Sequence, residues 1–153
     1  QLTQADFPAS VREVVLSGCL GRKKAFCFFT GKDKALAEEK MRKMEILDLA
    51  DRCYRELSGG QKQRALLARS MCAAKEMMLL DEPVTGLDPT ATEEFYATVK
   101  QLHREGLTVV MISHDPEKAL SSATHVLHLG QSMLYFGKTD GYDRGQILLK
   151  EEH

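Results

Sequence analysis

The sequence predicts an α/β fold in which a helical N-terminal part is followed by a core of mostly parallel strands. Residues 1–73 place their apolar side chains at helical spacing and show no clear strand pattern. The period then changes, and two short apolar runs, 77–80 and 107–112, flank a helical pattern. Two buried strands joined by a helix form a right-handed parallel crossover. We therefore expect a helical domain over residues 1–73 and a strand-containing domain over residues 74–153.

Cap residues place the helices of the first part. Ser10 is expected to cap one helix, and Asp33 to cap a second that continues through roughly Lys43. Residues 46–50 predict a further short helical turn.

The second part alternates between helix and strand. One helix is predicted to begin at Asp88 and to end at Gly106, because Asp favours helix starts and Gly favours the position after a helix. A weaker helix over 116–122 and strands near 125–129 and 133–136 follow. This alternation favours the α/β class.

The stretch Leu57-Ser58-Gly59-Gly60-Gln61 has the composition of a phosphate-binding turn. It precedes a helical pattern with a broad apolar face. A small-residue turn at a helix start points unpaired N–H groups and the positive end of the helix dipole outward, and this combination binds phosphate. Lys62 and Arg64 add positive charge nearby.

Two carboxylates, Asp81 and Glu82, directly follow the apolar run 77–80. Because this run is apolar on successive residues, it predicts a central parallel strand that is buried on both faces. Chemistry in open α/β sheets lies just beyond the carboxyl ends of the strands. Two adjacent acids there are costly to bury without a cation or a proton-transfer task. The second run ends at Ser113-His114, so Glu82 and His114 are expected at the same sheet edge.

These motifs resemble those of the ATP-binding-cassette (ABC) ATPases. Residues 57–61 resemble the signature motif, 77–82 the magnesium-strand (Walker B) motif with its catalytic glutamate, 85–88 the D-loop, and 113–115 the switch histidine. The four motifs occur in the family's order. The resemblance implies an incomplete P-loop NTPase fold, made of the helical subdomain and the C-terminal half of the mostly parallel-sheet core.

The resemblance also implies a role for each motif, with ATP and Mg²⁺ as the bound groups. Asp81 would hold the magnesium ion, Glu82 would act as general base on the attacking water, and His114 would hydrogen-bond the γ-phosphate. Asp88 would act across a dimer. The signature residues implied as contacts to nucleotide held by the partner chain are Ser58, Gly59, Gly60 and Gln61.

The phosphate-binding P-loop of the family is absent from the 153 residues. Gly137-Lys138-Thr139 has the right ending, but Ser132 stands where the first glycine belongs. The chain is therefore expected to be the C-terminal half to two-thirds of an ABC subunit, whether cropped or naturally truncated, and to be inactive alone. The family's Q-loop glutamine is Gln1, Gln4 or a residue outside the sequence.

The sequence is compatible with three functions. Residues 7–15 resemble importers of zinc and manganese, which implies an importer ATPase peripheral to the cytoplasmic side of the membrane. Its partners would be a second ATPase subunit and a transmembrane permease. The alternatives are an ABC-type ATPase of DNA repair, chromosomes or ribosomes, and an inactive half-subunit that lends its signature loop to a partner.

Composition excludes several other classes of protein. The net charge of −1 gives no indication of a nucleic-acid partner. The four cysteines are scattered without CxxC spacing, which is typical of reduced thiols in a cytosolic protein. Residues 119–137 contain no charged side chain, but polar residues and glycine interrupt them too often for a membrane-spanning helix. His103, His125 and His128 are assigned no function.

Overall fold

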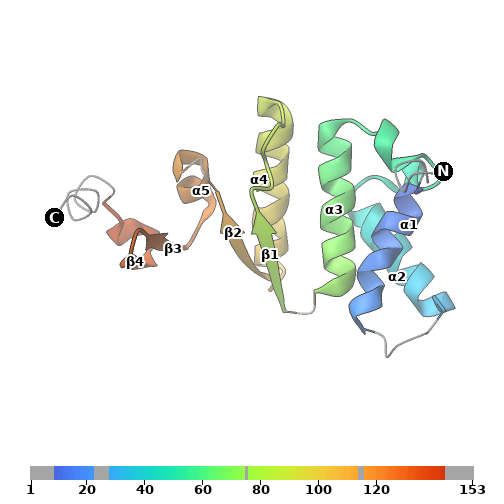
Figure 1. Ribbon diagram of the computed structural model, residues 1–153, viewed down its shortest axis with the longest axis horizontal. Coiled ribbons are helices and arrows are strands. Elements are labelled where there is room, and N and C mark those ends of the chain that lie inside the picture. Colours follow the sequence, from blue (N-terminus) through green and yellow to red (C-terminus); the bar gives the residue numbers. More distant parts are fainter. Residues whose placement is uncertain (1–8, 23–27, 75, 114–115, 144–153) are drawn as a thin grey trace. The chain divides into compact units, whose positions relative to one another are not determined.

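The computed structural model describes residues 9–22, 28–74, 76–113 and 116–143, and the chain divides into two compact units (Figure 1). The first unit comprises Gln1–Ile112 and the second Ser113–His153. The domain division expected after residue 73 stays a prediction. The elements of the first unit are α1 (Val11–Leu16), η2 (Ser17–Arg22), α2 (Gly31–Lys43), η3 (Leu47–Leu49), η4 (Tyr54–Glu56), α3 (Gly59–Ala73), β1 (Met77–Asp81), α4 (Pro89–Arg104) and β2 (Thr108–Ile112).

The predicted strand–helix–strand unit is confirmed. Strands β1 and β2 pair in parallel, from Met77 opposite Thr108 to Asp81 opposite Ile112, and α4 connects them. Helix α4 begins where the sequence predicts, because the Asp88 side chain accepts a hydrogen bond from the N–H of Ala91. It ends before Gly106, whose φ of +97° is a left-handed conformation that glycine adopts without strain.

Each of the three α-helices that the structure describes before β1 begins with a capping box, in which the cap side chain and the third helical residue bond each other's backbone N–H. The pairs are Ser10 with Glu13, Thr30 with Asp33, and Ser58 with Gln61. The expectation that Asp33 is the cap of α2 is wrong: Thr30 is the cap, and Asp33 is the acidic third residue of its box. Both residue types favour a helix start, so the sequence pattern fits either placement.

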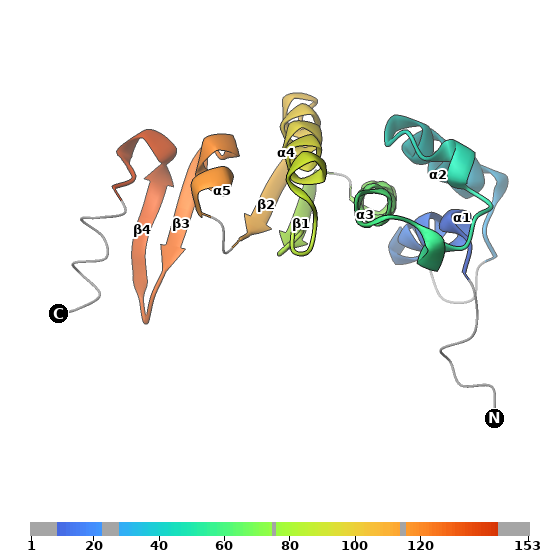
Figure 2. The ribbon, with the colours of Figure 1, turned by 90° about the horizontal axis from the view of Figure 1, so that it is seen from above.

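Helices α1, α2 and α3 enclose the main core. Figure 2 shows α3 beside α1 and α2, and the three pack against one another pairwise. The largest side chains that are fully buried there are Met41, Ile46, Leu67, Val11, Val15, Cys19 and Cys72. At Gly18 the packing is so close that a Cβ atom would lie 2.1 Å from the carbonyl oxygen of Arg69 in α3.

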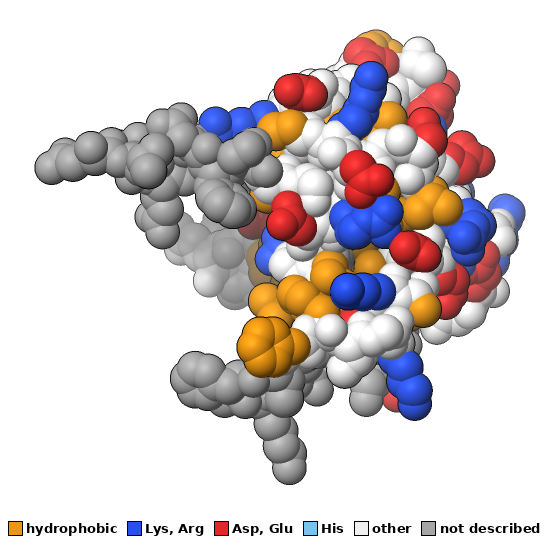
Figure 3. All heavy atoms as spheres, turned by 90° about the vertical axis from the view of Figure 1, so that its right-hand side faces the viewer, with side chains coloured by type: hydrophobic (Ala, Val, Ile, Leu, Met, Phe, Trp, Pro, Cys, Tyr) orange, Lys and Arg blue, Asp and Glu red, His pale blue; other side chains and the backbone are white. Residues whose placement is uncertain are grey.

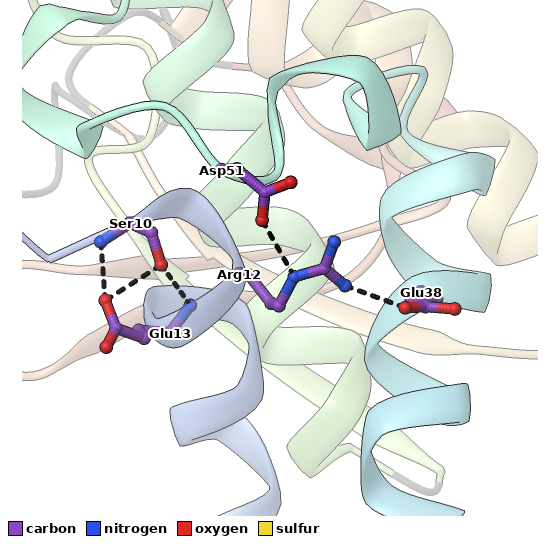
Figure 4. A network of polar contacts seen from close by, with 5 residues as sticks. All are labelled: Ser10, Arg12, Glu13, Glu38 and Asp51. Carbon is purple, nitrogen blue, oxygen red and sulfur yellow. Dashed lines mark hydrogen bonds and ion pairs between the residues drawn. The ribbon is translucent and has the colours of Figure 1, made fainter.

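Ion pairs hold the outer face of this helical part. Arg12 of α1 contacts Glu38 of α2 at 2.7 Å and Asp51 at 3.2 Å (Figure 4). Seen from the side of α1 and α2, acidic and basic side chains are interspersed on the surface (Figure 3). Such a mixed surface agrees with the near-neutral net charge.

The strand pair β1–β2 is buried on one face only, so the expected burial of β1 on both faces is wrong for this chain. Met78 and Leu80 are 3% and 8% exposed, whereas Met77 and Leu79 are 60% and 69% exposed. Alternate side chains of a strand point to opposite faces. One face packs into the core with α4, and no described element of the unit covers the other face.

The second unit contains α5 (Pro116–Ser122), β3 (His125–Leu129), β4 (Met133–Lys138) and η5 (Thr139–Gly141). Strands β3 and β4 form an antiparallel pair, which confirms the predicted strands. The ring of His128 contacts the hydroxyl of Tyr142 at 3.0 Å. Within the described residues of the chain, no helix is long and apolar enough to cross a membrane.

Candidate functional site

The predicted signature turn forms the start of α3, a helix of 15 residues. The hydroxyl of Ser58 accepts a hydrogen bond from the N–H of Gln61 at 3.3 Å, and the Gln61 side chain accepts one from the N–H of Ser58 at 3.0 Å. The N–H groups of Gly59 and Gly60 lie in the same first turn and have no acceptor within the helix. Ser58 and Gly59 are exposed. The turn therefore presents backbone donors at the positive end of a long helix.

The two signature glycines also allow close packing against the D-loop segment, residues 85–88, and the start of α4. A Cβ atom at Gly59 would lie 3.3 Å from the side chain of Leu87, and one at Gly60 would lie 3.3 Å from the Cβ of Ala91. Both distances are tighter than ordinary van der Waals contact. The glycines thus serve the helix–helix contact as well as the open turn.

The predicted carboxylates lie at the end of β1. Asp81 is its last residue and is exposed, whereas Glu82 is half-buried. The N–H of Glu82 bonds the carbonyl of Ile112 at 3.1 Å, which continues the strand pairing by one residue. Both carboxylates therefore lie at the sheet edge where β2 also ends, as the sequence predicts.

Glu82 has an unusual backbone conformation. Its φ is +44°, in the left-handed region that residues with a side chain rarely adopt. The hydroxyl of Thr85, three residues later, donates a hydrogen bond to its carboxylate at 3.2 Å. A strained backbone and an oriented carboxylate are typical of a functional position. The Thr85 contact had no signal in the sequence beyond its spacing from Glu82.

Two predicted site residues remain, Asp88 and His114, and the structure describes only Asp88. Asp88 is exposed and caps α4 through its bond to the N–H of Ala91 at 2.9 Å. His114 lies outside the described residues, as do Asp115 and the Q-loop candidates Gln1 and Gln4. The expected convergence of His114 with Glu82 stays a prediction.

Arg64, which the sequence predicts as added positive charge near the signature turn, is paired with two carboxylates. Its guanidinium contacts Glu94 of α4 at 2.8 Å and Glu45 at 3.3 Å. Two carboxylates therefore offset its charge. Sequence reasoning missed these partners, which are 30 and 19 residues away along the chain.

Residues 8–118 match the protein family described as "AAA domain, putative AbiEii toxin, Type IV TA system". The chain is 34% identical over 152 residues to the zinc uptake system ATP-binding protein ZurA of Listeria monocytogenes, which covers 95% of this chain and 59% of that protein. It is also 34% identical over 135 residues to the manganese transport system ATP-binding protein MntA of Synechocystis, covering 88% of this chain and 52% of that protein.

A solved structure of an ABC transporter in an inward-facing conformation matches with a TM-score of 0.88 and 29% sequence identity, covering 97% of this chain and 60% of that chain. The chain spans about 59% of the length of the zinc relative that it matches. The predicted fold, an incomplete ABC-type P-loop NTPase, is thereby confirmed. The chain belongs to the AAA-domain family whose model matches residues 8–118, and it is an ABC-type ATPase domain, in part, similar to the ATP-binding subunits of zinc and manganese transport systems.

Proposed function

We propose that this chain is the signature and Walker B part of the ATP-binding subunit of an ABC importer. The complete subunit couples ATP binding and hydrolysis to the import of a substrate, a divalent metal ion such as zinc or manganese. The proposal is supported by relatives named for zinc uptake and manganese transport. The single observation that carries the ATP-binding role is the capped, glycine-lined start of α3.

The signature turn binds the γ-phosphate of ATP held by a second ATPase subunit. The N–H groups of Gly59 and Gly60 and the hydroxyl of Ser58 are the donors available at the start of α3. Gln61 takes part by holding Ser58 through the capping box. Asp88, exposed at the start of α4, faces the same partner.

The end of β1 fits a magnesium ion. Magnesium prefers oxygen ligands, keeps several waters and is bound through one or two carboxylates together with substrate phosphates. Asp81 supplies one exposed carboxylate, and the described residues contain no cluster of three or more metal-binding side chains that would form a complete cage. Asp81 would hold the ion, whose charge would offset that of the phosphates.

Glu82 acts as general base toward the attacking water in this proposal. Its carboxylate is half-buried and oriented by Thr85, so that it can accept a proton from water near Asp81. His114 hydrogen-bonds the γ-phosphate and that water. The whole subunit works with a second ATPase subunit and a transmembrane permease, at the cytoplasmic side of the membrane.

Rescue of a defective partner tests the signature role. The chain is mixed with a complete ABC ATPase subunit whose own signature loop has been disabled, and phosphate release is measured. We expect the chain to restore hydrolysis at the partner's P-loop. The Gly60→Asp variant should abolish the rescue, because a carboxylate there repels phosphate and its Cβ would lie only 3.3 Å from the Cβ of Ala91.

Gly31→Asp is the matched control. Gly31 also begins a helix, α2, but a Cβ there meets nothing within 4 Å, so this variant should rescue like the unmodified chain. Equal rescue by Gly60→Asp, or no rescue by the unmodified chain at saturating concentration, would refute the signature role.

A further inference from the structure

Helices α3 and α4 lie side by side with their N-terminal turns together (Figure 1). The cap of α3 is Ser58, in the signature turn, and the cap of α4 is Asp88, in the D-loop segment. Gly60 of the first helix meets Ala91 of the second. Whatever fixes this helix pair therefore also fixes the spacing between the two predicted nucleotide-facing segments.

Arg64 joins the two helices one turn beyond that contact. It follows Gly60 by four residues and lines the same crevice between α3 and α4, together with Ala91 and Glu94. One guanidinium nitrogen lies 2.8 Å from the carboxylate of Glu94, and the other lies 3.3 Å from that of Glu45. The rigid fork of arginine suits two such contacts at once. The Arg64 side chain is 32% exposed, so part of this ion pair is shielded from solvent.

Glu45 has a backbone conformation that glutamate does not favour. It follows Met44, the last cap residue of α2, and its φ is +56°. Glycine or asparagine is usual at this position after a helix, because a Cβ makes the left-handed conformation strained. A glutamate there costs stability locally, and its carboxylate reaches Arg64. A strained backbone conformation such as that of Glu45 is typical of a functional position, so the contact between Glu45 and Arg64 is a candidate for a function.

We propose that Arg64 is a positioning residue, which sets the signature turn against the start of α4 through Glu94 and Glu45. It acts through the orientation of α3, since its two ion-pair contacts are to carboxylates of this chain. The inference rests on the proposed function, in which Ser58 and Asp88 together face nucleotide on a partner subunit.

Charge exchange in the rescue assay tests the proposal. Reversal of either charge, Arg64→Glu or Glu94→Arg, turns attraction into repulsion and should lower the maximal rescued rate by about tenfold. The double variant, which exchanges the two charges, should recover to within about threefold of the unmodified chain. The ATP concentration at half-maximal rate should not change, since the P-loop belongs to the partner subunit.

Titration of the chain distinguishes a loss of folded protein from a misplaced signature turn. Unfolding raises the chain concentration needed for half-maximal rescue and leaves the plateau unchanged, whereas misplacement of the turn lowers the plateau itself. Glu45→Gly separates the two effects further: it should relieve backbone strain and keep the melting temperature at or above that of the unmodified chain, yet lower the plateau about twofold.

Arg69→Glu is the control for charge alone, because it makes the same charge change at an exposed position of the same helix and should rescue like the unmodified chain. A double exchange variant that rescues no better than the worse single variant would overturn the proposal. An equal loss of rescue with Arg69→Glu and Arg64→Glu that the double variant does not repair would also overturn it. If the unmodified chain rescues nothing, the proposed function fails, and Arg64 is then tested by hydrogen exchange of the amides of residues 59–64. Arg64→Glu should speed the hydrogen exchange of these amides, and the double variant should restore the slower rate. If Arg64→Glu leaves the rate of hydrogen exchange unchanged, the proposal is overturned.

Discussion

Helices α1, α2 and α3 surround several large apolar side chains that are fully buried, whereas the strand pair β1–β2 leaves half of its own exposed. Met41, Ile46 and Leu67 are each no more than 1% exposed among α1, α2 and α3. Leu79 in β1 is as apolar but is 69% exposed. The difference shows that burial depends on how many elements pack around a segment: three helices surround the first group, and helix covers only one face of the strands.

The two regions also differ in the chemistry that we assign to them. The signature turn is complete within the first unit, since its capping box lies at the start of α3 and its glycines contact Leu87 and Ala91. The edge of β1 presents Asp81 and Glu82, but no P-loop sequence occurs in the 153 residues. We therefore expect substitutions in the two regions to have different effects on binding, hydrolysis and stability.

The largest expected effect is on hydrolysis and comes from the edge of β1. In a subunit that joins this sequence to a P-loop segment, Glu82→Gln should slow ATP hydrolysis by about 10²–10⁴-fold, because it removes the general base. Nucleotide affinity should stay the same, since the phosphate contacts remain. Single-turnover hydrolysis and equilibrium binding measure the two quantities, with the exposed Glu93→Gln as control. Hydrolysis by the Glu82→Gln variant at the parent rate would show that another residue is the general base.

The next effect is on the packing of the helical part. Gly18→Ala should destabilise the first unit by about 3 kcal/mol or more, because overpacking at an immovable backbone atom forces a shift of a helix. The new Cβ would lie 2.1 Å from the carbonyl oxygen of Arg69. Gly21→Ala is the matched control, since a Cβ at Gly21 meets nothing within 4 Å. Chemical denaturation followed by circular dichroism measures both; equal stability of the two variants would contradict the packing.

A pair of truncations compares the two regions directly. Met41→Ala should cost about 2–5 kcal/mol of unfolding free energy, because it leaves a cavity among three helices. Leu79→Ala should change stability by about 0.5 kcal/mol or less, because the side chain is already in solvent. Urea denaturation measures the loss of unfolding free energy in each variant, and the ratio of the two losses compares the regions. A cost at Leu79 close to that at Met41 would mean that another element covers the strand face.

Local signals explain how much of this structure was predictable. The starts of α1, α3 and α4 follow from Ser10, Ser58 and Asp88, each of which bonds a backbone N–H within its own first turn. The parallel strand pair followed from two apolar runs and the helix between them. These features depend on residues a few positions apart, so one sequence is enough to predict them.

Distant contacts explain what was missed. The two partners of Arg64 come from α4 and from the turn after α2, and no spacing rule connects them. The exposed face of β1 was predicted to be buried because an apolar run shows which residues suit a core and does not show whether a second layer packs on them. The left-handed backbone of Glu82 likewise depends on the strand end and the turn that follows it.

The smallest expected effect is a pH dependence at the start of α1. The backbone N–H and the hydroxyl of Ser10 donate hydrogen bonds to the Glu13 carboxylate (Figure 4), and they lower its pKa below the usual 4.5. A carboxyl whose pKa is lower in the folded state stabilises the fold above the pKa of the unfolded chain. That contribution is lost as the pH falls below 4.5 and through the folded value.

Glu13→Gln isolates this contribution, since glutamine also completes a capping box but does not titrate in this range. Glu39 and Glu105 have lowered pKa values as well, because Lys40 and Lys43 respectively bond their carboxylates, so the stability of both proteins should fall in acid. The loss between pH 6 and pH 3, measured by denaturation, should be smaller for Glu13→Gln than for the unmodified chain. Parallel stability curves over that range would show that the Ser10–Glu13 contact is too exposed to affect the folding of the helical part.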